Sequence, residues 1–319
     1  ILGRATLDTY TQFMDERIAV GSQGTPGYTR YDISWSERNY DLIASFDKNV
    51  GTDFNVKALV GTNRRRSEYT YLGQATSGGL IVPGLYSIAN SKGTIPNPVE
   101  KYEPRAADGY FAGLTLGYKE TLVLDGTFRR DRSSTLPSSS NAYNYFGVSA
   151  GWIFSKHIPQ LDWISYGKLR LNYAEVGNDA PWGSVKDVYD QPTPFGSSVL
   201  FSMAGTKNNQ HLLPERTVSR EAGLEMSFLN NRFGFDVTYY ASNTFNQILA
   251  ASVSTATGFN SQYVNAGNIQ NKGVELSAYI VPVRTKDFSW NINVNWTRNR
   301  NKVVELFKDE TGNEIKNIS

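Results

Sequence analysis

The most regular stretch of the chain is Phe288-Ser289-Trp290-Asn291-Ile292-Asn293-Val294-Asn295-Trp296-Thr297, in which large apolar side chains alternate with small polar ones at every position. Successive side chains of a β-strand point to opposite faces, so this stretch predicts a strand with one apolar and one polar face. Residues 273–280 alternate in the same way, and 281–287, which contain Pro282, separate the two runs. Together they predict an antiparallel hairpin.

The same hairpin unit recurs along the chain. Residues 221–228 and 233–242 alternate on either side of Asn230-Asn231, and 40–46 and 54–60 alternate on either side of Asn49-Val50-Gly51. Residues 110–118 and 121–128 meet at Lys119-Glu120, and further strands are expected at 1–10, 145–154 and 165–175. This gives about eleven strands of roughly ten residues, the length of a tilted membrane-crossing strand. The predicted fold class is therefore all-β, an antiparallel transmembrane β-barrel.

The predicted connections alternate between short and long. Short links follow residues 48, 118, 154, 228 and 282, and long loops are expected at about 11–36, 67–108, 131–143, 176–216 and 244–270. Outer-membrane barrels have short periplasmic turns and long extracellular loops. We therefore expect the long loops to be extracellular and the turn at Lys119-Glu120 to face the periplasm.

The composition fits such a barrel and excludes several function classes. Aromatic residues make up 13% of the chain, yet the mean hydropathy is −0.42, as expected if only one face of each strand is apolar. The net charge of +2 gives no reason to expect a nucleic-acid partner, and the absence of cysteine excludes thiol chemistry. An odd number of strands would leave unpaired edges in lipid. The expectation is that 1–319 is part of a barrel whose remaining strands and plug domain lie outside this sequence.

Several motifs, in order along the chain, resemble SusC/RagA-type TonB-dependent outer-membrane transporters. Arg129-Arg130-Asp131-Arg132-Ser133-Ser134 is similar to the family's "RRDGSS", with Arg132 in place of glycine. Residues 146–152 look like "PSVSAGW", and 168–178 look like "KLRASYGxxGN". Further matches lie at 214–215, 221–225, 265–269, 271–275 and 301–304.

The resemblance implies an integral protein of the bacterial outer membrane, in contact with membrane lipid. In that family a 22-stranded barrel with an N-terminal plug is energised through the TonB complex. A SusD-like surface lipoprotein presents the oligosaccharide or peptide substrate, and two such pairs can form a dimer. The implied function is energy-coupled nutrient import, with no enzyme activity and no cofactor.

The residues themselves offer no catalytic or metal site. His157 and His211 are far apart in the sequence and lack a neighbouring nucleophile or metal-ligand spacing. Arg64-Arg65-Arg66, at the outer end of a predicted strand, fits anionic lipid headgroups or a solvated surface better than nucleic acid. Rings stack on sugars and amides form paired hydrogen bonds, so the ligand-contacting candidates are loop residues, with packing inside the loops as the simpler reading. These candidates are Trp182, Tyr189, Phe195, His211, Tyr263 and Asn265.

Two alternatives to the importer remain open at this point. A secreted carbohydrate-binding β-propeller or solenoid would also be rich in aromatics and glycine, but it predicts a repeat of fixed length. A passive porin or an adhesin barrel would share the membrane wall without energy coupling.

Overall fold

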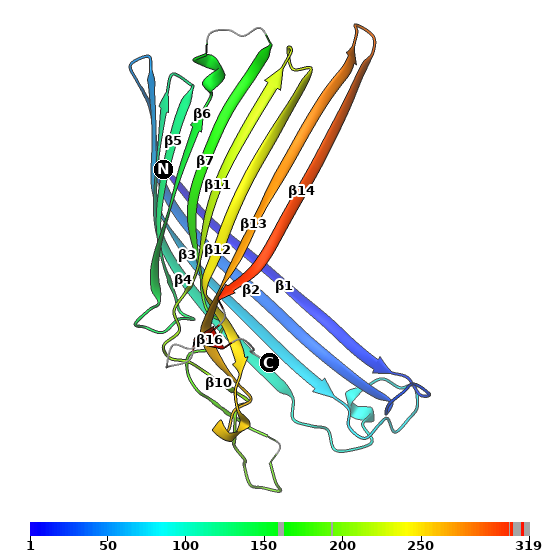
Figure 1. The fold of residues 1–319 in the computed structure, drawn as a ribbon. Helices are drawn as coiled ribbons and strands as arrows, with labels where there is room; N and C mark the ends of the chain where they lie inside the picture. Colours follow the sequence, from blue (N-terminus) through cyan, green and yellow to red (C-terminus); the bar gives the residue numbers. More distant parts are fainter. Residues whose placement is uncertain (159–162, 193, 306, 309–313, 316–319) are drawn as a thin grey trace.

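The computed structural model describes residues 1–158, 163–192, 194–305, 307–308 and 314–315. One curved antiparallel sheet dominates it. In Figure 1 the first strands (blue) cross the view obliquely to the last ones (orange and red), because the sheet curves around. The described ranges leave out part of the link expected after residue 154, residue 193 of the loop expected at 176–216, and the last four residues. Eleven long strands form the sheet: β1 Leu2–Ile18, β2 Gly27–Val50, β3 Phe54–Ala75, β4 Val99–Tyr118, β5 Leu122–Ser133, β6 Ala142–Trp152, β7 Ile164–Asn178, β11 Glu215–Phe228, β12 Phe233–Ser252, β13 Ser261–Arg284 and β14 Ser289–Glu305.

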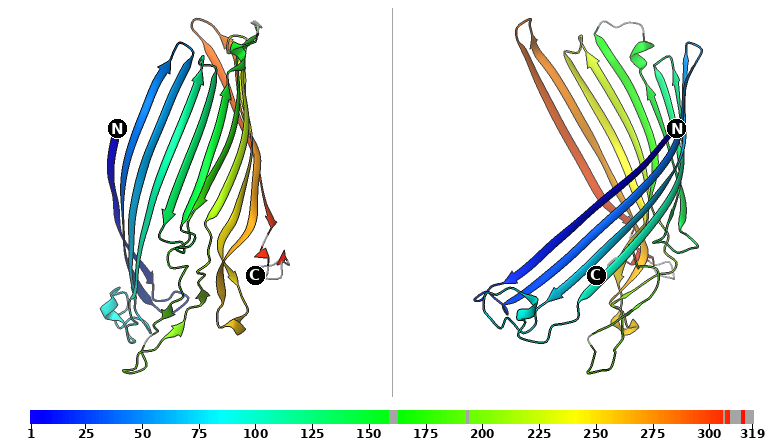
Figure 2. Two further views of the ribbon diagram at one scale, coloured as in Figure 1. Left: turned by 90° about the vertical axis from the view of Figure 1, so that its left-hand side faces the viewer. Right: turned by 180° about the vertical axis from the view of Figure 1, so that it is seen from behind.

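Each long strand pairs antiparallel with the next long strand in the sequence, from β1 to β14. The hairpins expected on either side of Gly51, Glu120 and Asn230 all form. This single continuous meander confirms the all-β antiparallel prediction and excludes a propeller, whose sheet would be divided into blades. Seen from the side, the strands tilt together and the sheet curves as a section of a barrel wall does (Figure 2).

The remaining elements are short. Residues 206–207 form β10, which adds two parallel pairs to the edge of β13. No helix in the described ranges is long and apolar enough to cross a membrane. The other short elements are η1 Ile88–Asn90, η2 Phe154–Lys156, β8 Tyr189–Asp190, β9 Ser202–Met203, η3 Thr255–Thr257, β15 Phe307–Lys308 and β16 Glu314–Ile315.

The predicted loop boundaries were wrong, because the strands continue well into the expected loops. The connection expected at 11–36 shrinks to 19–26, and that expected at 67–108 shrinks to 76–98. The connections at 131–143, 176–216 and 244–270 shrink to 134–141, 179–214 and 253–260. These five connections all lie at the lower end of the sheet in Figure 1 and the others at the upper end. The difference in length is not strict, because the upper connection at 153–163 is longer than those at 19–26, 134–141 and 253–260.

The turns at Lys119-Glu120 and Asn230-Asn231 form where the sequence places them, whereas the turn expected at 49–51 lies at 51–53. Thr121 N–H donates to the Tyr118 carbonyl across Lys119 and Glu120, which both have positive φ, as in the turns that best match hairpin twist. The turn expected at 281–287 forms later, because β13 runs on to Arg284 through a bulge between Ile280 and Val283. Pro282 sits in that bulge, where its missing N–H disturbs no ladder hydrogen bond.

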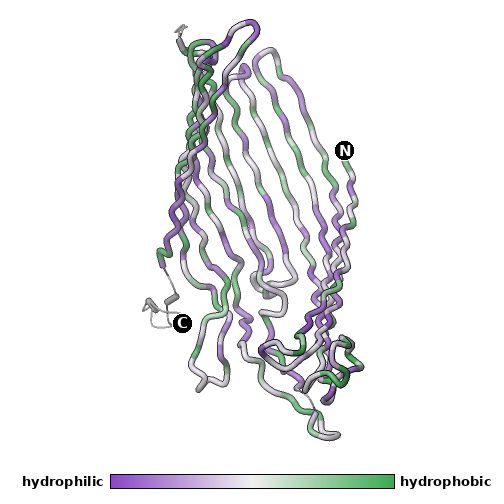
Figure 3. The backbone as a smooth tube through the Cα atoms, turned by 90° about the vertical axis from the view of Figure 1, so that its right-hand side faces the viewer, coloured by the Kyte–Doolittle hydropathy of each residue, from purple (hydrophilic) through white to green (hydrophobic). Residues whose placement is uncertain are grey.

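The two faces of the sheet differ in composition, and hydropathy alternates along the strands (Figure 3). In β6, Phe146, Val148 and Trp152 share one face and are exposed, whereas Tyr145 and Ser149 on the other face are partly buried. A soluble protein would show the reverse. Polar side chains also reach over an intervening strand, since the Tyr240 hydroxyl on β12 donates to Asn299 on β14. We therefore call the polar face inward and the apolar face outward.

Along the longest strands, the apolar residues change from the outward face to the inward face. In β2 the outward face carries Tyr40, Leu42, Ala44 and Phe46, whereas the more distal outward positions carry Arg38 and Ser36. Over that distal part the apolar residues are Tyr31, Ile33 and Trp35, which lie on the inward face. The reversal marks one boundary of the outward apolar band.

The largest buried apolar cluster lies at the base of the long connections, not within the sheet. Leu136 and Leu212, from two different connections, pack with Ala180. Tyr143, Ile248 and Tyr263 from the strand ends pack against them. We call these six residues the loop-base cluster; it fastens the connections at 134–141 and 179–214 to the sheet.

Candidate functional site: the inward face of the sheet

The inward face carries a network of ion pairs and hydrogen bonds that crosses neighbouring strands. Arg129 Nε lies 2.8 Å from Asp131 Oδ1 on β5, and the Tyr145 hydroxyl on β6 donates to the same carboxylate. Arg130, between them in sequence, points to the outward face. Of these two consecutive arginines, only Arg129 faces inward, and it forms an ion pair there.

A second part of the network joins β7, β11 and β12. Arg170 Nη1 lies 3.2 Å from Glu225 Oε2 and Nη2 lies 2.5 Å from Asp236 Oδ1. Glu225 and Asp236 are direct cross-strand partners, so Arg170 neutralises two carboxylates that would otherwise repel each other. Gly223 makes room for this arrangement, because a Cβ there would approach Arg170 Nη2 to 2.9 Å.

Beyond the outward apolar band, the inward face of β1 to β3 carries a row of aromatic rings. Tyr10, Trp35 and Tyr69 are consecutive cross-strand partners, and the Tyr10 and Trp35 rings stack with their centroids 5.7 Å apart. One step further out, the Tyr31 and Tyr71 rings lie 5.9 Å apart. We call these five residues the aromatic strip.

Charged side chains border the aromatic strip. A groove of about 510 Å³ is lined by Trp35, Tyr69 and Ser67 and by five charged residues, Glu37, Arg65, Lys101, Glu103 and Arg105. Desolvation raises the pKa of the Tyr69 phenol further above neutrality. Stacking rings beside charges of both signs can bind a ligand that has flat apolar faces and many hydrogen-bonding groups.

Sequence reasoning missed the aromatic strip because Tyr31, Trp35, Tyr69 and Tyr71 fall within residues expected to be loops. The signal was present as period-two spacing, at Tyr31, Ile33 and Trp35 and at Tyr69 and Tyr71. It was out of phase with the apolar positions of the same strands nearer the short turns, which is why the strands were predicted to end too early.

Three of the predicted ligand-contacting residues lie on the long connection between β7 and β11. Trp182, Tyr189 and Phe195 are exposed, Phe195 at 82%. Tyr189 belongs to the short hairpin of β8 and β9, and Phe195 forms a bridge with Ser198. The structure gives no ring contact between these three among the residues it describes, so each remains a separate candidate.

The other three candidates lie close to the sheet. His211 is exposed beside Leu212 of the loop-base cluster, and Tyr263 packs against that cluster. Asn265 uses its amide within the chain: it accepts from the Leu213 N–H at 2.8 Å and donates to the Leu213 and Asn246 carbonyls. Tyr263 and Asn265 are thus already engaged in holding the connection at 179–214. In the described ranges, no group of three or more His, Cys, Asp or Glu side chains could hold a metal ion.

A curved antiparallel sheet with an apolar convex face and a polar, hydrogen-bonded inner face defines the wall of an integral outer-membrane β-barrel. Residues 4–319 match the model of the family described as TonB dependent receptor-like, beta-barrel. The chain belongs to that family, which is a family of outer-membrane transporters and not of enzymes.

Relatives and solved structures agree with this assignment. The chain is 27% identical to TonB-dependent receptor P26 of Formosa agariphila over 85% of its own length and 28% of the relative's. It is 28% identical to TonB-dependent receptor SusC of Bacteroides thetaiotaomicron over 62% of its length and 21% of the relative's. It is similar in fold to the RagAB peptide transporter, with a TM-score of 0.82, 19% identity, and coverage of 96% of this chain and 34% of that one. The chain thus spans about a third or less of the proteins it matches.

Proposed function

We propose that this sheet forms part of the wall of an energy-coupled importer for oligosaccharides or peptides. The observation that carries the proposal is the aromatic strip with its charged border, on the inward face and beyond the apolar band. A ligand entering the barrel from outside would meet this surface before it reached the level of the membrane. Both ligand classes combine flat apolar faces with dense hydrogen-bonding groups, which matches the chemistry of the surface.

We further propose that the complete wall has 22 strands, with the long connections extracellular. Eleven strands in one continuous arc would supply half of that wall. Energy coupling through the TonB complex, a SusD-like surface lipoprotein over the long connections, and dimers of such pairs complete the proposal. The similarity to SusC and to the RagAB peptide transporter supports this assembly.

We propose four residues of the connection at 179–214 as ligand contacts: Trp182, Tyr189, Phe195 and His211. They are exposed, and this connection lies at the same end of the sheet as the other long connections. We propose that Tyr263 and Asn265 contribute by positioning this connection, since their side chains already contact it.

The proposal is tested by replacing Trp35 with alanine in the full-length protein and measuring uptake of labelled oligosaccharides and labelled peptides by cells. Loss of one stacking ring should weaken apparent affinity for one of the two ligand classes by about threefold to tenfold. Trp290→Ala is the matched control, because Trp290 lies on the outward face and is exposed there.

Uptake should also stop when TonB is deleted. Import that continues without TonB would contradict energy coupling and favour a passive porin. Equal uptake by Trp35→Ala and Trp290→Ala cells would remove the aromatic strip from the transport path.

A further inference from the structure

The outward face carries a concentration of arginines directly beyond its apolar band. Arg38, Arg64 and Arg66 follow Tyr40 and Thr62 on β2 and β3, and Arg130 and Arg132 follow Phe128 on β5. The register places Arg38 opposite Arg66 on β3, and it places Arg64 and Arg132 on either side of Asp108 on β4. The five arginines, on β2, β3 and β5, therefore occupy adjacent rows of the sheet. We call them the arginine girdle.

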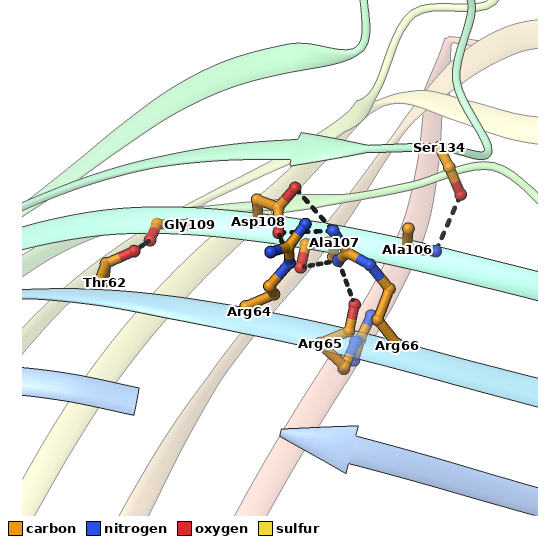
Figure 4. Close-up of polar contacts among 9 residues, drawn as sticks. All are labelled: Thr62, Arg64, Arg65, Arg66, Ala106, Ala107, Asp108, Gly109 and Ser134. Atoms are coloured by element: carbon orange, nitrogen blue, oxygen red, sulfur yellow. Dashed lines mark hydrogen bonds and ion pairs between the residues drawn. The ribbon is translucent and has the colours of Figure 1, made fainter. Parts of the chain in front are cut away.

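Few carboxylates on the same face oppose this charge. Asp108 pairs with two arginines: its Oδ1 lies 3.0 Å from Arg66 Nη2 and 3.5 Å from Arg64 Nε (Figure 4). Arg38 lies 3.5 Å from Glu68. Arg130 and Arg132 are exposed and have no ion-pair or hydrogen-bond partner within the described ranges. The five positive charges thus face two carboxylates.

The arginines of the girdle differ in how many contacts fix their side chains. Arg66 donates to the backbone carbonyls of Arg65 and Ala107, at 2.7 Å and 3.2 Å. Its side chain is less exposed than those of Asp108 and Arg64. Among the described residues, the Arg64 side chain makes only the long contact to Asp108, and it is 65% exposed. Arg66 and Asp108 therefore form a fixed support, and the Arg64 guanidinium has donors left for a ligand.

A groove of about 750 Å³ joins these side chains to the apolar band. Its lining includes Arg64, Arg130 and Arg132 together with Tyr40 and Tyr110. Leu42, also in the lining, is the first aliphatic residue of the band below. The lining also contains three carboxylates, but Asp41, Asp108 and Asp131 each form an ion pair within the chain. Arg130 and Arg132 are left without a counter-charge among the described residues, so a ligand that fills the outward part of the groove would carry negative charge there and continue into an apolar part along the lipid-facing surface.

The positive charge continues around the sheet at the same boundary. On β14, Arg298 and Arg300 follow Trp296 on the outward face, and Arg300 is the cross-strand partner of Lys272. At the opposite boundary, near the short turns, the outward ends of β2, β3 and β5 carry Val50, Phe54 and Leu122, with Lys48 of β2 as a single outward basic residue. The excess of basic residues is thus at the boundary nearer the long connections.

We propose that the arginine girdle binds the phosphate groups of a phosphorylated lipid in the outer leaflet of the outer membrane. Guanidinium groups donate paired hydrogen bonds to phosphate, and basic residues at headgroup level attract anionic lipid. Lipid chains of the bound molecule would lie along the apolar band below Tyr40 and Tyr110. The inference depends on the membrane location of the sheet and not on the proposed transport.

The test compares the full-length protein with an Arg64→Gln, Arg130→Gln, Arg132→Gln triple variant, both purified in a zwitterionic detergent. Each is titrated with purified lipopolysaccharide, with the same lipopolysaccharide after enzymatic dephosphorylation, and with inorganic phosphate, and Tm is followed by intrinsic fluorescence. Lipopolysaccharide should raise the Tm of the unaltered protein, and the triple variant should need a roughly hundredfold higher concentration for the same shift. Arg65→Gln is the matched control, because Arg65 adjoins Arg64 in sequence but faces inward.

Three results would overturn the proposal. The first is an equal Tm shift from intact and dephosphorylated lipopolysaccharide, and the second is a full shift from inorganic phosphate alone, which would leave no role for the lipid. The third is an unchanged titration of the triple variant, or an Arg65→Gln variant that is weakened as much. Should the triple variant not fold, as judged by circular dichroism, Arg132→Gln alone is titrated, and an unchanged response would count against the proposal.

Discussion

Arg170 shows how single residues stabilise the inward face of the sheet. It links three strands, because it contacts Glu225 on β11 and Asp236 on β12 from its own position on β7. The side chain is about one-third exposed, at 34%, so its ion pairs are partly screened by solvent. Its main role is to separate two carboxylates that face each other across the strands.

Replacing Arg170 with alanine should lower the free energy of unfolding by about 1–2 kcal/mol, because the Glu225 and Asp236 carboxylates lose their shared counter-charge. Urea unfolding of the full-length protein in detergent, followed by tryptophan fluorescence, measures the change. Adding Asp236→Asn should recover part of the loss. Asn172→Ala, two residues away on the same face of β7, is the control, and an equal loss in that variant would contradict the assigned role.

Asn265 is a second residue whose role can be tested individually. Its three hydrogen bonds tie the connection at 179–214 to β12 and β13. Asn265→Ala should therefore speed limited proteolysis within 179–214 by roughly tenfold, since each lost hydrogen bond contributes about 1 kcal/mol to closing the segment. The cleavage rate on intact cells gives the measurement.

Gln262→Ala on the same strand serves as the control for Asn265, because the Gln262 side chain makes no hydrogen bond within the described ranges. Similar cleavage rates in the two variants would show that Asn265 does not hold the connection.

The elements were predictable near the short turns and less so beyond the apolar band. Around Lys119-Glu120, strict alternation and polar turn residues identified both strands and the turn. In β2, the apolar positions change from Leu42 and Tyr40 on one face to Trp35 and Ile33 on the other. A strand read with a single phase ends at that change, although the backbone pairing with β3 continues to Thr29.

The candidate site was less predictable than the fold, because it depends on how distant strands pair. Aromatic residues were expected to contact ligand from the long loops, and Trp182 and Phe195 do lie on a connection. The aromatic strip instead depends on the pairing of Tyr10 with Trp35 and of Trp35 with Tyr69, residues far apart in the sequence. Only the register of three strands brings them into one row.

The turn between β4 and β5 gives a prediction at the level of the element. Lys119 and Glu120 have φ of 48° and 52°, a region that costs a non-glycine residue about 1–2 kcal/mol. Lys119→Asn with Glu120→Gly supplies the residues that this turn prefers, and it should raise the free energy of unfolding by about 1 kcal/mol. The Lys119–Asp53 contact that is lost is long, at 3.5 Å, and exposed, so its removal costs little.

The opposite change in stability is expected at the neighbouring turn between β2 and β3, where glycine is already present. Gly51 has φ of 66°, and Gly51→Ala should lower the unfolding midpoint measured in the same urea titration. If both changes shift stability in the same direction, backbone strain is not what limits these turns.

At the scale of the whole molecule, the arrangement of polar and apolar surface is inverted relative to a soluble protein. Val148, in the middle of β6, is 53% exposed. Its cross-strand partners are Tyr173 on β7 and Gly126 on β5, and Gly126 lies between Leu124 and Phe128 on the same face. Water cannot be the medium that contacts this face over so many strands, because contiguous apolar surface of this extent is not stable in water. The period-two pattern of the sequence predicted this face correctly because it reports which side of each strand meets lipid.

The medium around the sheet can be tested with one charge on each face. Val148→Arg places a guanidinium on the outward face in the middle of the apolar band, where transfer of arginine into a bilayer costs about 2–4 kcal/mol. Ser149→Arg places the same side chain one residue along on the inward face, near Asp125, where polar groups can solvate it. Equilibrium folding of the full-length protein into phospholipid vesicles should therefore show a loss of about 2–4 kcal/mol for Val148→Arg and a much smaller change for Ser149→Arg. Equal effects of the two substitutions would mean that the two faces meet the same medium, which no barrel wall in a membrane allows.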